Sequence, residues 1–87
     1  MPQQERIGVI GIIVENPRAS AEQVNALLSQ YAGIIVGRMG VPYRAKALSI
    51  ISLIIDGTTD EIGALCGKLG NVPGVTAKSV LAPQSRA

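Results

Sequence analysis

Histidine, tryptophan and phenylalanine are absent from this 87-residue sequence, and its only aromatic residues are two tyrosines. Without histidine, the chain lacks the side chain that most often serves as a general base or as a transition-metal ligand. No pair of carboxylates and no activated nucleophile takes its place, so we expect no enzymatic activity. The few aromatic rings also argue against RNA recognition on a sheet, because that mode stacks bases on strand aromatics.

A single cysteine, Cys66, excludes an internal disulfide and a C-x-x-C motif. It falls among apolar helical positions near Ile62 and Leu69, so we expect a buried structural thiol. No stretch reaches the roughly 18 apolar residues of a membrane-spanning helix. The polar N-terminus also lacks the apolar core of a signal peptide. Together these absences predict a cytoplasmic protein with no membrane association, no metal and no cofactor.

Charge is also scarce, since 8 basic and 6 acidic residues give a net charge of +2. That excess is too small to indicate nucleic-acid binding by itself. Hydrophobic residues make up 47% of the chain, which is high for a small soluble monomer.

The second half of the chain has the pattern strand, helix, turn, strand. Leu48 to Ile55 is a short β-branched run that ends at a turn signal, Asp56-Gly57. Thr58 and Glu61 have the spacing of a capping box, which predicts a helix start. Ile62, Leu65 and Leu69 then form the apolar stripe of that helix. Gly70 is expected to end the helix in a left-handed conformation, and Val75 to Leu81 predicts an edge strand.

The first half repeats this pattern more loosely. Ile7 to Val14 predicts a strand, and Ser20 with Gln23 predicts a second capping box. Apolar residues at helical spacing follow, and Ile34 to Met39 predicts the next strand.

Two βαβ halves predict an α+β, ferredoxin-like βαββαβ sandwich, in which a four-stranded antiparallel sheet carries two helices on one face. We expect one domain over residues 6–82, a disordered N-terminus over residues 1–5 and a flexible tail over residues 83–87.

Both predicted central strands, the first and the third, are apolar on both faces, although the helices can cover only one face. We therefore predict that a second copy of the chain covers the other face, giving a dimer or a tetramer by sheet stacking or by edge pairing. The alternative is that a loop or the tail of the same chain covers it. The residues expected at the interface are Ile10, Ile12, Val36, Ile50 and Ile54.

The segment from Gly37 to Arg44 is the strongest candidate for a ligand site. Its glycines allow close backbone approach, and Pro42 stiffens the chain. Arg38 and Arg44 have the geometry to hold a carboxylate or phosphate in a bidentate manner, and Tyr43 offers a ring and a hydroxyl. The alternative is a long hairpin whose arginines are simply solvated.

The segments I-V-G-R-M-G-V-P-Y-R and D-G-T-T-D-E-I-G-A-L-C-G-K-L-G-N-V-P-G-V together give the chain a family resemblance. From about Ile7 to Leu81 it resembles the small ACT-like proteins named as iron-only hydrogenase system regulators of anaerobic bacteria. The domain is also similar to the C-terminal domain of nickel-responsive repressors. The resemblance implies a homo-oligomeric regulatory module that binds a small-molecule effector at a subunit interface. The nickel function does not carry over, because those repressors use histidine-rich sites.

The resemblance also directs attention to the loop after the first strand, because this loop commonly shapes the ligand site of ACT-like folds. The predicted ligand-binding residues are therefore Glu15, Asn16, Arg38, Gly40, Tyr43 and Arg44. The alternative functions are a nucleic-acid-binding domain and a protein-partner adaptor. Nucleic-acid binding would need a separate DNA-binding element, and only about six residues precede the first predicted strand.

Overall fold

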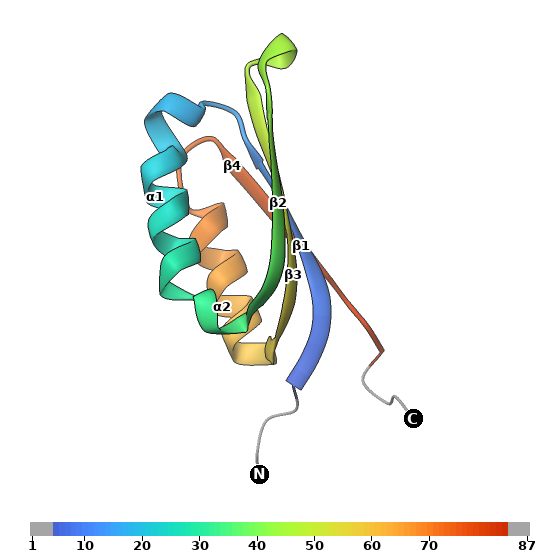
Figure 1. Ribbon diagram of the computed structural model, residues 1–87. Helices are drawn as coiled ribbons and strands as arrows, with labels where there is room; N and C mark the ends of the chain where they lie inside the picture. The colour runs from blue at the N-terminus through green and yellow to red at the C-terminus, as the bar shows by residue number, and fades with distance from the viewer. Residues whose placement is uncertain (1–4, 84–87) are drawn as a thin grey trace.

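The computed structural model describes residues 5–83 and has the element order βαββαβ (Figure 1). The strands form one antiparallel sheet in the order β2-β3-β1-β4, and both helices lie on the same face of it. The elements are β1 (Glu5–Val14), α1 (Pro17–Gln30), β2 (Ile35–Tyr43), β3 (Leu48–Thr58), α2 (Thr59–Gly70) and β4 (Val75–Leu81). Two short 3₁₀ turns, Ala32–Ile34 and Arg44–Lys46, precede β2 and β3. The predicted sandwich, with the first and third strands in the centre of the sheet, is confirmed. β1 includes Glu5, which we had expected to be disordered, and the expectations for residues 1–4 and 84–87 lie outside the described residues.

The core lies between the helices and the inner face of the sheet. Alternate residues of the two central strands point into it, because side chains of a strand alternate between faces. They pack against the apolar stripes of both helices. The most deeply buried side chains are Ile10, Ile12, Leu53, Ile55, Val24, Leu28, Ile62, Leu65 and Leu69.

The opposite face of the sheet, which we call the outer face, carries no described helix (Figure 1). It is apolar along most of its length, as the strand pattern predicted. Nine large side chains on it are each more than 40% exposed: Ile7, Val9, Ile13, Met39, Val41, Tyr43, Ile50, Ile54 and Val80.

Two of the predicted interface residues are placed wrongly by the sequence analysis. Ile10 and Ile12 are fully buried in the core, because the even-numbered positions of β1 face the helices. They therefore cannot contact a second copy. Ile50 and Ile54 do lie on the outer face, and Val36 is exposed at a β-bulge in β2.

The two helices begin in different ways. At α2 the predicted capping box is present: the Thr58 hydroxyl accepts from the Glu61 amide at 3.1 Å, and the Glu61 carboxylate accepts from the Thr58 amide at 2.9 Å. At α1 the predicted box at Ser20 is wrong, because the helix already begins at Pro17 with Asn16 as its N-cap. Ser20 is buried in the first turns and donates to the Pro73 carbonyl oxygen at 2.8 Å.

Two turn predictions also need correction. Asp56 and Gly57 continue β3 and pair with β1, so they form no turn. Gly70 is the last residue of α2 and does not have a positive φ, whereas Gly74, in the turn before β4, has φ of 75°.

The β2–β3 hairpin makes the molecule elongated, with extents of 44 × 20 × 17 Å. Its tip, Arg44–Lys46, projects past the N-terminal end of α1 (Figure 1). A furrow therefore forms between the inner side of the hairpin and the start of α1. Neither of the described helices is long and apolar enough to cross a membrane.

Candidate functional site

The furrow between α1 and the β2–β3 hairpin, which we call the hairpin groove, consists of two adjoining cavities. They share Pro17 at the start of α1 and the cross-strand pair Pro42–Ser49 of the hairpin. The inner cavity, of about 280 Å³, lies over the sheet, and the outer cavity, of about 610 Å³, opens toward the hairpin tip.

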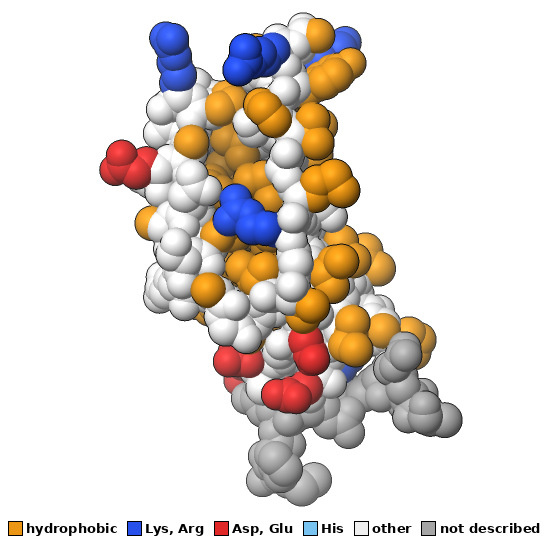
Figure 2. All heavy atoms as spheres, viewed as in Figure 1, with side chains coloured by type: hydrophobic (Ala, Val, Ile, Leu, Met, Phe, Trp, Pro, Cys, Tyr) orange, Lys and Arg blue, Asp and Glu red, His pale blue; other side chains and the backbone are white. Residues whose placement is uncertain are grey.

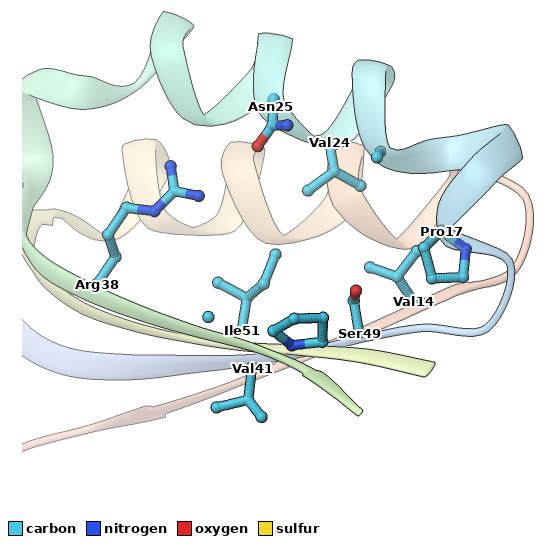
Figure 3. Close-up of a pocket in the computed structure, with 11 residues that line it drawn as sticks. Val14, Pro17, Val24, Asn25, Arg38, Val41, Ser49 and Ile51 are labelled. Carbon is cyan, nitrogen blue, oxygen red and sulfur yellow. The ribbon is translucent and has the colours of Figure 1, made fainter. Parts of the chain in front are cut away.

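The inner cavity is mainly apolar, and its three polar side chains are Asn25, Arg38 and Ser49. Val14, Val24 and Ile51 line it from β1, α1 and β3. In Figure 3, Arg38 of β2 and Asn25 of α1 point into the same space from opposite sides. Such a lining suits the aliphatic part of a small molecule, with hydrogen bonds near one end.

The outer cavity collects charge. Arg18 from the first turn of α1 and Arg44 from the hairpin tip both line it, and Glu15 is the one carboxylate there. Neither arginine forms an ion pair with another residue of the described segment 5–83. Guanidinium groups without a protein partner are suited to binding a carboxylate or phosphate through paired hydrogen bonds.

The start of α1 adds to this preference for anions. Asn16 makes no side-chain capping bond, and the first turn contains no acidic residue. The positive end of the helix dipole therefore lacks the compensation that α2 receives from Thr58, Asp60 and Glu61. A bound anion would supply that compensation at α1.

The structure brings most of the predicted ligand-binding residues to this groove. Glu15, Asn16 and Arg44 line the outer cavity, and Arg38 and Gly40 line the inner one. Tyr43 lines neither cavity, because its position in β2 places it on the outer face opposite Leu48. Val41 lies on that face as well, and its side chain points away from the groove in Figure 3.

Sequence reasoning missed Asn25 and Ser49 as site residues. Pro17, Ala21 and Asn25 are spaced by four along α1, so the helical period could have suggested that they share a face. Ser49 had no such signal, because its place in the groove depends on its pairing with Pro42 across the hairpin.

The remaining candidate groups give no second site. Cys66 is partly buried and packs against the core, and Tyr31 packs there too with the Lys68 amine 5.2 Å from its ring centre. Within residues 5–83, no three histidine, cysteine, aspartate or glutamate side chains gather closely enough to hold a metal ion.

Comparison with known proteins places this geometry in context. Residues 6–79 match a family model described as "TM1266-like: Iron-only hydrogenase system regulator, putative". Among solved structures, the uncharacterized protein TM1266 from Thermotoga maritima is 38% identical, with a TM-score of 0.88 over 92% of this chain and 100% of that chain. No curated protein matched the sequence.

Two more distant structures share the fold. The ACT domain of the GTP pyrophosphokinase of Chlorobium tepidum is 22% identical, with a TM-score of 0.75 over 88% of this chain and 100% of that domain. The C-terminal domain of the MgtC protein of Mycobacterium tuberculosis is 16% identical, with a TM-score of 0.71 over 100% of this chain and 98% of that domain. At these identities the similarity establishes an ACT-like fold alone.

Proposed function

Since the chain belongs to the TM1266-like family of iron-only hydrogenase system regulators, we propose that it is a non-catalytic, homo-oligomeric regulatory module that binds a small anionic effector. The effector occupies the groove between α1 and the β2–β3 hairpin, on the opposite side of the hairpin from the surface that contacts a second subunit. The module then acts on the hydrogenase system through a protein partner.

One observation carries this proposal. Arg18 and Arg44, which have no ion-pair partner within residues 5–83, line the outer cavity beside a helix start without a side-chain cap, and the adjoining inner cavity is mainly apolar. A small amphipathic carboxylate fits this arrangement. Its carboxylate would lie between Arg18 and Arg44, and its aliphatic part would contact Val24 and Ile51. An amino acid fits further, because Glu15 offers a partner for its ammonium group.

Oligomerisation is supported by the apolar outer face. Monomeric proteins rarely expose a continuous apolar surface of this kind, and a two-fold contact between identical copies is the commonest way to cover one. The second copy is therefore part of the regulatory module in this proposal.

The effector is tested first by native mass spectrometry of gently purified protein, which reveals any retained small molecule by its mass. A thermal-shift screen with the twenty amino acids and small mono- and dicarboxylates follows. We expect at least one of these compounds to raise the melting temperature. The effector proposal fails if no compound does so and no extra mass is retained.

Arg44→Ala tests the place of binding. Removing a charge-assisted hydrogen bond costs about 1.5–3 kcal/mol, so the Kd of the active compound should rise about tenfold or more in calorimetric titration. Lys68→Ala is the matched control, because it removes the same charge from α2, outside the groove. Equal effects of both variants would contradict this location.

A further inference from the structure

We propose that two copies stack their outer faces in antiparallel fashion, so that the basic hairpin tip of each copy lies over the acidic end of its partner. This inference rests on the homo-oligomer in the proposed function and adds the arrangement of the subunits.

The register gives the outer face a centre. Gly11 of β1 pairs with Ser52 of β3, and these are the smallest side chains in the middle of the face. Val9 and Ile54 form the next outward-facing pair on one side, and Ile13 and Ile50 form it on the other. A two-fold axis over Gly11 and Ser52 therefore places each apolar pair against the other apolar pair of the second copy. The small central residues allow the two sheets to approach closely.

The two ends of the face carry opposite charge. Arg44 and Lys46 form the hairpin tip, whereas Glu5 and Asp56 occupy outward-facing positions at the other end of β1 and β3. We call Glu5 and Asp56 the acidic end. Figure 2 shows basic side chains at the hairpin end of the molecule and acidic side chains at the opposite end. None of these four residues forms an ion pair with another described residue between positions 5 and 83.

Charge decides between the two ways of stacking such faces with two-fold symmetry. An axis parallel to the strands would bring tip over tip and acidic end over acidic end, which places like charges together. An axis across the strands brings each tip over the acidic end of the other copy. The eight steps of β3 from Leu48 to Asp56 alone span ~26 Å at the usual rise per residue, so the two ends do not neutralise each other within one chain. Opposite charges across the interface favour the second arrangement over the first.

Lys78 is the one cation near the middle of the described outer face, where it pairs with Gly11. It belongs to β4, at the edge of the sheet. Its long side chain can therefore lie along the apolar surface while its amine reaches water at the rim.

Charge exchange tests the arrangement. Each contact occurs twice in a two-fold dimer, so Lys46→Glu and Asp56→Lys should each raise the dimer Kd about tenfold in sedimentation equilibrium at about 50 mM salt. The double variant K46E/D56K should return to within about threefold of the unchanged protein, because the pairs form again with exchanged signs. Lys68→Glu, on the helix side, is the matched control and should leave the dimer Kd unchanged. High salt should narrow all these differences, since exposed pairs are screened.

Each result has one meaning. A dimer that is indifferent to both reversals, or one that the double variant weakens further, overturns the antiparallel arrangement and leaves the homo-oligomer of the proposed function standing. A protein that remains monomeric at all concentrations overturns both.

Cross-linking gives a second measurement, which uses the unchanged protein. A carbodiimide joins an amine to a carboxylate only when they touch, forming an amide with loss of water. A mixture of ¹⁴N- and ¹⁵N-labelled protein should yield mixed-isotope peptides that join Lys46 to Asp56 or to Glu5. Mixed-isotope peptides restricted to other lysine–carboxylate pairs would contradict the arrangement.

Discussion

Gly57 has a different structural role from the one that its residue type suggests. The dipeptide Asp56-Gly57 predicts a turn, but the structure continues β3 through it. A Cβ at Gly57 would lie 2.9 Å from Cγ2 of Ile34 and 3.1 Å from a carboxylate oxygen of Glu61. Here glycine permits the end of the strand to pack closely against Ile34 and Glu61, and close approach of neighbouring groups is a common reason for glycine in a strand.

Gly57→Ala should therefore lower the free energy of unfolding by about 1–3 kcal/mol, the usual cost of forcing extra volume into a packed site. The measurement is urea unfolding at a fixed protein concentration. Gly63→Ala is the matched control, because a Cβ there meets nothing within 4 Å and the residue lies within α2. That variant should be more stable by about 0.5–1 kcal/mol. Equal destabilisation by both changes would refute the packing explanation.

Ser20 is a polar residue whose role also differs from the one that the local sequence predicts. Its spacing to Gln23 matches a capping box, yet Pro17 already occupies the first position of α1. The Ser20 hydroxyl instead holds the Pro73 carbonyl, 53 residues away in the sequence. Local spacing cannot distinguish these roles, because the true partner is brought close only by the packing of α1 beside the turn before β4.

At the scale of elements, α2 was the most predictable part of the chain, because its start signal is entirely local. Both hydrogen bonds of the capping box lie within four residues, and Asp60 and Glu61 complement the dipole. The start of α1 was less predictable, because Asn16 and Pro17 define it without a side-chain capping bond.

Thr58→Ala should remove the capping bond to the Glu61 amide and lower the free energy of unfolding by about 1 kcal/mol. Thr59→Ala, one residue later, is the control, since that exposed side chain is not the cap. Thermal unfolding of the two variants at equal concentration makes the comparison. A loss for Thr59→Ala as large as that for Thr58→Ala would show that the capping bond is not the cause.

The hairpin groove was only partly predictable from the sequence. Residue type indicated Arg38, Gly40 and Arg44, whereas Glu15 and Asn16 were indicated by the resemblance to ACT-like folds. It could not indicate how α1 and the hairpin come together, because the two cavities depend on long-range pairs such as Pro42 with Ser49. Tyr43 was assigned to the site by proximity in sequence, and strand alternation puts it on the other side of the sheet.

For the whole molecule, strand patterning predicted a sheet that is apolar on both faces. It did not reveal which face of β1 packs against the helices. Ile10 and Ile12 were therefore assigned to an interface, although they form part of the core. The sequence divides each strand into two alternating sets of residues, but both sets are apolar. Only the placement of the helices in the structure shows which set is buried.

Ile54→Asp should separate the subunits and leave the fold intact, because this side chain is 49% exposed on the outer face and a charge there can remain solvated in the monomer. Sedimentation velocity should show the monomer, and the far-UV circular dichroism spectrum should be retained. Ala26→Asp, which introduces the same charge on the exposed side of α1, should leave the oligomer unchanged. If Ile54→Asp still sediments with the unchanged protein, the outer face is not the subunit contact.

The β2–β3 hairpin borders the hairpin groove with its inner side and the outer face with its other side, so the two proposed binding equilibria would share one structural element. Thermodynamic reciprocity then applies: any factor by which the effector changes subunit affinity is also the factor by which pairing changes effector affinity. Titrations at nanomolar and at micromolar protein concentration should thus give different apparent effector affinities. Under the proposed function, the regulatory response would then depend on the cellular concentration of the chain as well as on the concentration of the effector.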